Sequence, residues 1–370
     1  MRKEEEVNYA ALWMWARFSP RRIVFLLRIN WRRWRANRRR RRQQRRIDGS
    51  IPLVLAISST MRCNYNCKAC YSRGRPTDDE LSTDELDALF SEAEDLGIHS
   101  IVLTGGEPLL RDDILDLIAH HHRLFFFLIT NGSLVTPEIA RRIAQSGNIV
   151  LLVSIERFAS DTDELRQPGA HETAMRAFAH LRKARAVFGF VATNTSANTS
   201  QLATDEFIDQ MVTFGCAVGF FTEYVPCGPN PRPDWVLDEA ARAALRKRVL
   251  EFRRSKPIVI SQFPDDEYGK ENRCSGAGRL SLHINSQGDV EPCPFVSISH
   301  ENIRHGGLIA ACQSPFLRAI REQPKLLQRQ RYACSLFEHR AELDGLAQQF
   351  GVHCGQNRDN LAEWIIMSST

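Results

Sequence analysis

Short β-branched runs alternate with longer helical patterns from residue 53 to about residue 260. The runs are almost continuously apolar, which is typical of a parallel sheet covered by helices. The six expected strands are residues 53–58, 100–104, 124–130, 149–155, 188–193 and 218–225. The expected helices between them are residues 83–96, 111–122, 136–146, 171–186 and 203–214. The first of these opens with a capping box of Ser82 and Glu85 and ends at Gly97. This alternation predicts a partial parallel barrel or open α/β sheet, with its active site at the carboxyl ends of the strands.

The character of the chain changes after residue 227, where a stiff link rich in proline and turn residues precedes a helix expected at 238–254. We therefore expect five segments. They are a basic helical arm (1–49), a core barrel (50–235), a connecting helix and strand (236–269), a small cysteine-bearing domain (270–350) and a tail (351–370).

Three cysteines follow the first expected strand within eight residues, because Cys63, Cys67 and Cys70 are spaced C-x3-C-x2-C. Three thiolates this close can wrap one face of an iron–sulfur cubane. Such clusters are normally held by four thiolates, so one iron would lack a protein ligand and could chelate a small molecule. A zinc knuckle with a missing ligand, or incidental thiols, are the alternatives that spacing alone leaves open.

The sequence Gly105-Gly106-Glu107-Pro108 stands at the end of the second expected strand, about 35 residues after these cysteines. The two motifs in this order resemble the radical S-adenosylmethionine (SAM) superfamily. The resemblance implies that the three cysteines ligate a [4Fe–4S] cluster whose fourth iron chelates SAM, and that the Gly-Gly-Glu-Pro motif positions the SAM amino group. It also implies reductive cleavage of SAM to a 5′-deoxyadenosyl radical, which abstracts hydrogen from a substrate carbon.

Other positions match the cofactor contacts of the family more loosely. The resemblance places Ser154 and Glu156, at the end of the fourth strand, against the SAM ribose, and Arg166 near the SAM carboxylate. Asn131, after the third strand, is either a cofactor contact or a turn residue. Ala69 stands before the third cysteine, where the family usually has an aromatic residue, which puts stacking on adenine from this position in doubt. No further catalytic residue is assigned.

A second cysteine set begins with Cys274 and Cys293, which are joined in the pattern C-x13-G-x4-C. Residues 280–284 alternate as a strand, residues 285–289 supply a turn and Val290 starts a return strand, so a hairpin brings the flanking cysteines together. This pattern resembles the start of the SPASM or Twitch extensions of radical SAM enzymes, which carry auxiliary [4Fe–4S] clusters. Because the further C-x2-C motifs of a full SPASM domain are absent, we expect one auxiliary cluster.

The remaining ligands of that cluster must come from Cys312, Cys334 or Cys354. We assign Cys334, because it stands at a loop-to-helix junction where a helix N-terminus favours an anionic thiolate. Cys312 follows a helical stretch and is either a ligand or a buried thiol. A structural zinc ion, which also accepts four cysteines, is the alternative for this set.

The predicted fold class is α/β. It consists of a partial (β/α)6 TIM-like barrel, a small C-terminal α+β Twitch-like cluster domain and a basic N-terminal helix.

The charge of the chain is divided unevenly along its length. Its 370 residues, of which 43% are hydrophobic and 25% charged, can form one large or two modest globular domains and exclude a disordered chain. The net charge is +5, yet residues 1–47 hold 16 lysines and arginines against 3 acids, which leaves 33 against 41 in the remainder. A cationic arm is therefore attached to an acidic body, and this asymmetry concerns partners rather than fold.

The arm is expected to be a basic amphipathic helix over residues 19–46, with Ser19 as its cap and Pro20 at its first position. Its tryptophans and arginines suit the surface of an anionic membrane, which is our main expectation. Docking on protein, including the acidic body of the enzyme itself, is the second reading. Nucleic acid is the least favoured, because no sequence-reading motif accompanies the arm.

No run of eighteen apolar residues is present, so we expect no membrane span. Residues 19–27 faintly resemble a twin-arginine export signal, but the apolar run stops at Arg28 and no small-residue cleavage site follows. We therefore expect a cytoplasmic protein that lies peripherally on the inner face of the membrane. In that compartment closely spaced cysteines are metal ligands rather than disulfides.

Together these features predict a radical SAM enzyme supplied with electrons by a donor such as flavodoxin or ferredoxin. We favour a lipid or isoprenoid-like substrate, because the arm suits a membrane. The alternatives within the family are a peptide or protein maturase and a small-molecule dehydrogenase. Outside it, the alternative is a non-catalytic iron–sulfur or zinc protein that senses redox state and binds nucleic acid. Such a protein has no need of Gly105–Pro108 beside an open iron.

Overall fold

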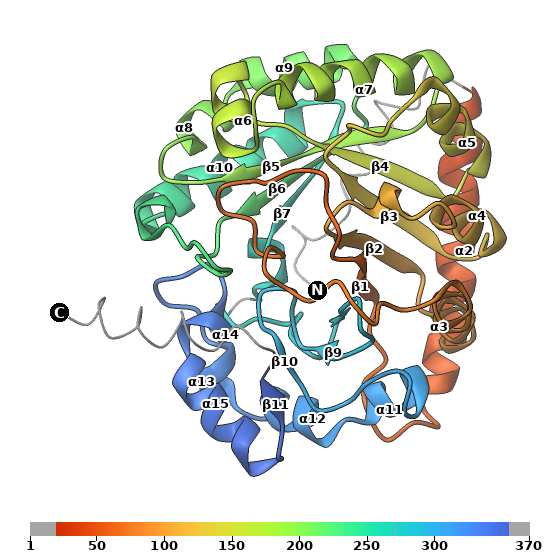
Figure 1. Cartoon of the computed structure of the whole chain (residues 1–370), viewed down its shortest axis with the longest axis vertical. Helices are drawn as coiled ribbons and strands as arrows, with labels where there is room; N and C mark the ends of the chain where they lie inside the picture. Colours follow the sequence, from red (N-terminus) through yellow and green to blue (C-terminus); the bar gives the residue numbers. More distant parts are fainter. Residues whose placement is uncertain (1–19, 270, 355–370) are drawn as a thin grey trace.

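The computed structural model of the chain describes residues 20–269 and 271–354 (Figure 1). Seven parallel strands follow one another in the sheet in sequence order, with helices packed outside them. These strands are β1 (Val54–Thr60), β2 (Ser100–Gly105), β3 (Phe125–Thr130), β4 (Ile149–Ser154), β5 (Phe188–Asn194), β6 (Val218–Glu223) and β7 (Val259–Phe263). The six-strand barrel prediction is therefore confirmed, and the strand expected in the connecting segment extends the same sheet.

Helical segments connect successive strands. They are α3 (Thr83–Leu96), η1 (Pro108–Leu110), α4 (Ile114–His120), α5 (Pro137–Ser146), α6 (Ala159–Leu165), α7 (Ala170–Ala184), α8 (Thr199–Leu202), α9 (Asp205–Phe214), η2 (Pro233–Trp235) and α10 (Glu239–Ser255). The Ser82–Glu85 capping box predicted for α3 is present, and Gly97 ends this helix in the left-handed conformation with φ of 79°.

Several of the expected elements differ in their bounds by one to three residues at an end. Residues 111–122 form only the short helix α4, because Pro108 starts a separate 3-10 turn. Residues 203–214 begin their helix at Asp205, where the Thr204 hydroxyl accepts from the Phe207 N–H and caps it. The expected strand 218–225 ends at Glu223. Helix α6 was not predicted, because its polar sequence carries no apolar periodicity.

The predicted hairpin forms but joins the main sheet. Strand β8 (Ser281–Ile284) pairs in parallel with β1, and β9 (Val290–Glu291) pairs antiparallel with β8. The sheet order is β7-β6-β5-β4-β3-β2-β1-β8-β9, so β7 and β9 are its two edges. The second cysteine region is thus attached directly beside the first strand of the barrel.

The remaining C-terminal elements pack around this hairpin. They are η3 (Asp265–Glu267), β10 (Ile298–Ser299), α11 (Gly307–Gln313), α12 (Pro315–Arg321), α13 (Pro324–Leu327), α14 (Ser335–Glu338), α15 (Arg340–Gln349) and β11 (His353–Cys354). Buried residues of these helices, such as Leu308, Phe316 and Leu343, belong to the same continuous core as the barrel strands.

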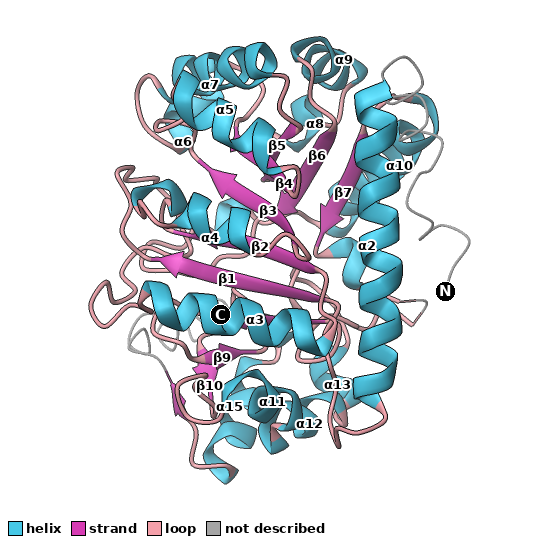
Figure 2. Ribbon diagram, turned by 90° about the vertical axis from the view of Figure 1, so that its right-hand side faces the viewer, coloured by secondary structure: helices cyan, strands magenta, loops and turns pink. Residues whose placement is uncertain are grey.

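The two faces of the sheet bury different sets of side chains. Alternate residues such as Phe126 and Leu128 face the outer helices in the main core. A second cluster on the opposite face contains Phe125, Val150 and Leu152. Helix α2 (Pro20–Gln44) covers this second cluster and crosses the end of the barrel where the strands begin (Figure 2). The cap predicted at Ser19 lies outside the described residues.

Candidate functional site

The Gly-Gly-Glu-Pro turn after β2 packs directly on the cysteine loop after β1. The Gly106 N–H donates to the Thr60 carbonyl at 2.8 Å, and the Glu107 N–H donates to the Arg62 carbonyl at 2.9 Å. A Cβ atom on Gly106 would lie 2.1 Å from the Arg62 carbonyl oxygen, so only glycine fits there. The two sequence motifs therefore form one unit at the carboxyl ends of neighbouring strands.

Glu107 is fully buried and ties this unit to the end of β3. One carboxylate oxygen accepts hydrogen bonds from the Thr130 hydroxyl at 2.8 Å and the Leu109 N–H at 3.1 Å. The other accepts from the Asn131 N–H at 2.8 Å. Burial raises the pKa of Glu107, although these donors act in the opposite direction. The carboxylate thus holds the glycine turn in place against β3.

The three cysteines of the first loop are partly open to solvent. Cys63 is exposed, while Cys67 and Cys70 are half-buried. Burial raises the pKa of Cys67 to about 11, with Arg166 lowering it and the two other cysteines raising it. Asn131 donates from Nδ2 to the Asn64 side-chain oxygen at 2.8 Å and so braces the loop from β3.

This trio has the donor type of an iron–sulfur cluster, because all three of its side chains are free thiols. In such a cluster each thiolate binds a different iron. Three free thiols in one loop, beside the two glycines Gly105 and Gly106, match the donors of a cluster with one open iron.

Glu156 and Arg166 form a buried ion pair beside this loop. The Arg166 Nε donates to one Glu156 oxygen at 3.0 Å and its Nη2 to the other at 2.9 Å. The Glu156 side chain has no exposed surface, and that of Arg166 is 13% exposed. Burial alone would lower the pKa of Arg166, but Glu156, Cys67 and Cys70 outweigh it and raise this pKa. The guanidinium therefore supplies a fixed positive charge next to the thiols.

The cofactor-binding residues predicted from the sequence come together at one end of the barrel. Ser154 is buried as the last residue of β4, and Asn131 follows the neighbouring strand β3. The remaining members lie at the ends of β2 and β4 or just after α6; they are Gly105, Gly106, Glu107, Pro108, Glu156 and Arg166.

The second cysteine set is brought together from distant parts of the chain. A hydrogen bond joins the thiols of Cys293 and Cys334, and it raises the pKa of Cys293 while lowering that of Cys334. Backbone N–H groups at the start of α14 also lower the pKa of Cys334, as expected for a residue at a helix N-terminus. Burial raises the pKa of Cys274 to about 12, and Cys334 lies near enough to raise it further. Cys274, Cys293 and Cys334 therefore form a second trio.

Tyr268 fixes the turn that carries Cys334. Its hydroxyl donates to the Ala333 carbonyl at 2.9 Å and accepts from the Ser335 N–H at 2.9 Å. Burial raises the pKa of Tyr268, and Cys334 and Cys274 raise it further, so the hydroxyl stays protonated as a donor. The residue before Cys334 and the residue after it are thus both held by one side chain.

Cys312 lies apart from this trio, and of Cys354 only the backbone is described. Cys312 is buried in α11, where its carbonyl accepts from the Ser50 N–H at 2.9 Å. Burial raises the pKa of Cys312 to about 12, with charge effects from Arg321 and Glu92 and from no cysteine of the described chain. Cys354 pairs through its backbone with Ile298. The structure thus brings together three of the candidate ligands of the second set.

A buried polar chain that sequence reasoning missed links the two cysteine regions. Arg75, five residues after Cys70, donates to the Glu291 carboxylate at 3.1 Å and to the Pro294 carbonyl at 2.9 Å. Burial lowers the pKa of His283, so the imidazole is neutral. Its Nδ1 donates to Glu291 at 2.6 Å and its Nε2 accepts from the Ser58 hydroxyl at 2.8 Å. No sequence pattern relates these residues, because they meet only through the pairing of β8 with β1.

Cys227 also lies between the two regions. It is 7% exposed, and its pKa, raised to about 12 by burial, responds to both Cys334 and Cys70. The next residue, Gly228, packs so closely that a Cβ there would lie 2.8 Å from the Cys70 carbonyl oxygen. The link after β6 is therefore seated on the first cysteine loop.

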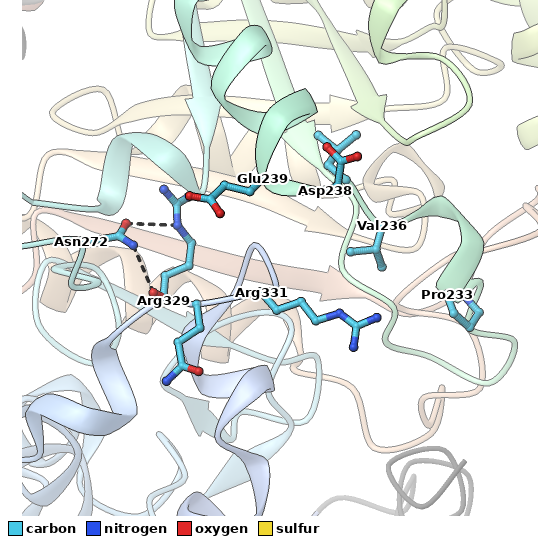
Figure 3. A pocket seen from close by; sticks show the side chains of 9 residues that line it. Pro233, Val236, Asp238, Glu239, Asn272, Arg329 and Arg331 are labelled. Atoms are coloured by element: carbon cyan, nitrogen blue, oxygen red, sulfur yellow. Dashed lines mark hydrogen bonds between the residues drawn. The ribbon is translucent and has the colours of Figure 1, made fainter. Parts of the chain in front are cut away.

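A polar groove of about 680 Å³ opens beside the second trio. Figure 3 shows Arg331 extending past Val236 toward Pro233, with Asp238 and Glu239 on the facing wall. Asn272 anchors one end, because it accepts from the Arg329 Nε at 3.2 Å and donates to the Arg329 carbonyl at 3.1 Å. One wall of the groove is the segment from Pro233 to Glu239, and the other consists of Asn272 and residues 329–331, which stand just before Cys274 and Cys334 in the chain.

Comparison with known proteins agrees with this geometry. The Radical SAM superfamily profile matches residues 57–194, which span the first cysteine loop, the glycine turn and β3 to β5. The AdoMet-dependent heme synthase of Methanosarcina barkeri is 33% identical over 285 residues, covering 69% of this chain and 80% of that protein. The mycofactocin maturase MftC of Mycolicibacterium smegmatis is 28% identical over 280 residues, covering 70% and 68%.

The fold has solved counterparts as well. The structure of Streptococcus suis SuiB bound to S-adenosylmethionine superposes with a TM-score of 0.64 and 19% identity, over 74% of this chain and 68% of that one. The chain belongs to the radical SAM superfamily and is a radical SAM enzyme, a class that uses SAM and a [4Fe–4S] cluster.

Proposed function

We propose that Cys63, Cys67 and Cys70 hold the [4Fe–4S] cluster of this enzyme. The observation that carries the proposal is the direct packing of the glycine turn on the cysteine loop. It sets Gly105 and Gly106, which carry no side chain, against the loop of three free thiols. Gly105–Pro108, Asn131, Ser154, Glu156 and Arg166 would surround SAM bound there.

The bound cluster and SAM supply one-electron chemistry that removes hydrogen from a substrate carbon. The chain itself provides placement and exclusion of water. Glu107 fixes the glycine turn, and the Arg166–Glu156 pair gives the thiol loop a positive neighbour without a mobile charge. The link at Cys227 and Gly228 covers the loop from the side of β6.

We further propose that Cys274, Cys293 and Cys334 hold one auxiliary [4Fe–4S] cluster in a Twitch-like arrangement. Support comes from the shared hydrogen bond of two thiols and from the helix N-terminus at Cys334. The Arg75–Glu291–His283 chain would set the distance between this trio and the first loop. If metal analysis of the purified protein finds zinc instead of iron at these three cysteines, the proposal is contradicted.

For the substrate we propose a peptide, which makes the enzyme a radical SAM maturase. The groove beside the second trio supports this, since its walls carry Asp238, Glu239 and Arg331. A lipid or isoprenoid-like molecule would strip water from these charges without pairing them, whereas a peptide offers charged and hydrogen-bonding groups. One relative is itself named a maturase.

A tetrapyrrole is the second candidate, because the relative with 33% identity is named a heme synthase. Mass spectrometry can separate the candidates. We would compare peptide, tetrapyrrole and lipid extracts from source cells with the wild-type gene, a chromosomal Cys70→Ala gene, and a Cys216→Ala control. Cys216 is a buried thiol outside both trios.

A peptide whose mass changes only in the Cys70→Ala cells supports the maturase. Loss of a tetrapyrrole product or of a lipid species in those cells would contradict it. With the purified enzyme, Arg331→Glu should raise the KM for the peptide about tenfold or more while SAM cleavage without substrate stays unchanged. The same charge reversal at the exposed Arg141 of α5 is the matched control.

A further inference from the structure

Helix α2 presents two different faces, and only one of them is used by the barrel. Phe25 and Ile29 pack on the inner face of the sheet, where the rings of Phe25 and Phe125 lie 6.1 Å apart. At the other end of the helix, Arg40 donates to the Ile51 carbonyl at 3.3 Å and Arg39 donates to the Glu94 carbonyl at 2.6 Å. This inward face closes the amino-terminal end of the barrel (Figure 2).

The outward face carries a row of apolar side chains that remain exposed to solvent. Val24, Leu27, Trp31 and Trp34 are 44%, 65%, 56% and 54% exposed. Their spacing of three, four and three residues places them on one side of the helix. Four large apolar side chains in one row, two of them indoles, exceed the scattered apolar residues of an ordinary surface.

Positive charge surrounds this row and continues it. The guanidinium of Arg35 lies 4.7 Å from the Trp31 ring centre, and that of Arg38 lies 4.9 Å from the Trp34 ring centre. The exposed residues Arg28, Arg41 and Arg42 extend the same side. The helix holds eleven arginines and no acidic residue. Its outward face is therefore apolar over the first turns and strongly cationic over the last.

We propose that the outward face of α2 binds the surface of an anionic membrane. Indoles prefer the headgroup level of a bilayer, and arginines beside them pair with anionic headgroups. Nucleic acid offers the same negative charge but no apolar layer for Leu27, Trp31 and Trp34. A second copy of the chain would place two acid-free arginine rows against each other, which like-charge repulsion disfavours.

The proposal also fixes the orientation of the enzyme. Helix α2 lies at the amino ends of the strands, whereas both cysteine loops follow carboxyl ends or lie beside them. With α2 on the bilayer, the SAM site faces the aqueous side. The arm is then an anchor rather than a route for lipid into the site, which removes our sequence-based reason for a lipid substrate. No helix of the described chain is long and apolar enough to cross the membrane.

The test is co-sedimentation of the full, reconstituted chain with vesicles of phosphatidylglycerol and phosphatidylcholine. Removal of residues 1–47 is a poor test, because it would uncover the apolar inner face of the sheet. Point variants on the outward face avoid this. We would compare the variant Leu27→Ser/Trp31→Ser/Trp34→Ser with the charge variant Arg38→Glu/Arg42→Glu. The matched control is Phe158→Ser/Ile309→Ser, which removes two apolar side chains of similar exposure elsewhere.

Wild type and control should bind anionic vesicles, bind pure phosphatidylcholine weakly and release as salt rises. The triple variant should lose at least about tenfold in vesicle partitioning, and the charge variant about fivefold or more per arginine. SAM cleavage should stay unchanged in both, which shows that they fold.

Failure of the wild type to bind anionic vesicles overturns the proposal. Undiminished binding by the triple variant also overturns it, because the apolar row would then be irrelevant. Tighter binding to DNA or RNA than to vesicles would assign the face to nucleic acid. A dimer that dissociates when Trp31 and Trp34 are replaced would assign it to a second copy.

Discussion

The two cysteine trios differ in how the chain builds them. Cys63, Cys67 and Cys70 come from one loop of eight residues, and Cys63 is exposed. Cys274, Cys293 and Cys334 span sixty-one residues, Cys334 is buried, and a hydrogen bond already joins two of the thiols. A local, partly open set suits a site whose ligand exchanges in every turnover. A set assembled by the fold from distant segments, with one buried and two half-buried thiols, suits a resident group.

The largest expected effect is the loss of activity in Cys70→Ala. This change removes one of the three thiols of the first loop, so the cluster cannot be held where SAM would reach it. Formation of 5′-deoxyadenosine by the reduced, reconstituted protein should fall to background. Cys216→Ala, which alters a core thiol, should keep more than half of wild-type activity. Equal activity in both variants would show that the first loop is not the site.

Cys334→Ala and Cys312→Ala together test which cysteine completes the second trio with Cys274 and Cys293. The Cys334→Ala variant should bind about four fewer irons per chain than the wild type, because Cys334 is one of the three proposed ligands of the auxiliary cluster. Cys312→Ala should keep the full iron content, since no cysteine influences Cys312. Iron and sulfide analysis decides between them. A loss of iron in Cys312→Ala instead would move the ligand set to α11.

The ion pairs beside the two trios should differ in what their loss costs. Arg166→Ala leaves Glu156 buried without a cation, which costs about 3–5 kcal/mol of stability. Arg75→Ala should cost less, because Glu291 keeps the hydrogen bond from His283. The fall in Tm of the reconstituted protein should therefore be larger for Arg166→Ala. The reverse ranking would contradict the contacts described for these two pairs.

The smallest effect concerns the opposite end of the barrel, where neither trio lies. Burial lowers the pKa of His99 to about 4, and Arg33 and Arg32 of α2 lower it further. Between pH 4 and about 6.5 the unfolded chain therefore binds a proton that the folded chain does not. Neutral His99 therefore makes its full contribution to the free energy of unfolding above about pH 6.5, and this contribution is lost as the pH falls toward 4.

Between pH 7.5 and pH 5 we expect His99 to account for a loss of about 2 kcal/mol. His99→Phe keeps the ring beside Phe125 and should reduce the fall in Tm between these pH values. Wild type and variant with the same pH dependence would show that the folded chain does not hold His99 in its neutral form.

The sequence predicted the parts of the fold that depend on local patterns. Strand runs, the Ser82–Glu85 box and the basic helix were confirmed within a few residues. The pairing of β8 with β1 could not be predicted, because a four-residue strand carries no information about its partner. The packing of α2 on the inner face of the sheet also has no local signal, so docking on the body of the enzyme was only the second reading of the arm.

In the candidate site, too, contiguous motifs could be predicted and contacts between distant residues could not. The loop of Cys63 to Cys70 and Gly105–Pro108 are contiguous motifs, so their spacing was sufficient to find them. The Arg75–Glu291–His283 chain joins residues more than two hundred positions apart and has no signal in one sequence. Cys334 could be chosen because the expected helix N-terminus beside it is present. Cys312 could not be decided, because the sequence does not show that α11 turns this thiol into the hydrophobic core.

The most direct test of two separate sites is the triple variant Cys63→Ala/Cys67→Ala/Cys70→Ala, reconstituted with iron and sulfide. The account predicts about four irons per chain, against about eight in the wild type, and no 5′-deoxyadenosine. Retention of these four irons would show that Cys274, Cys293 and Cys334 hold a cluster of their own. A triple variant without iron, or one with the full wild-type content, would contradict the account.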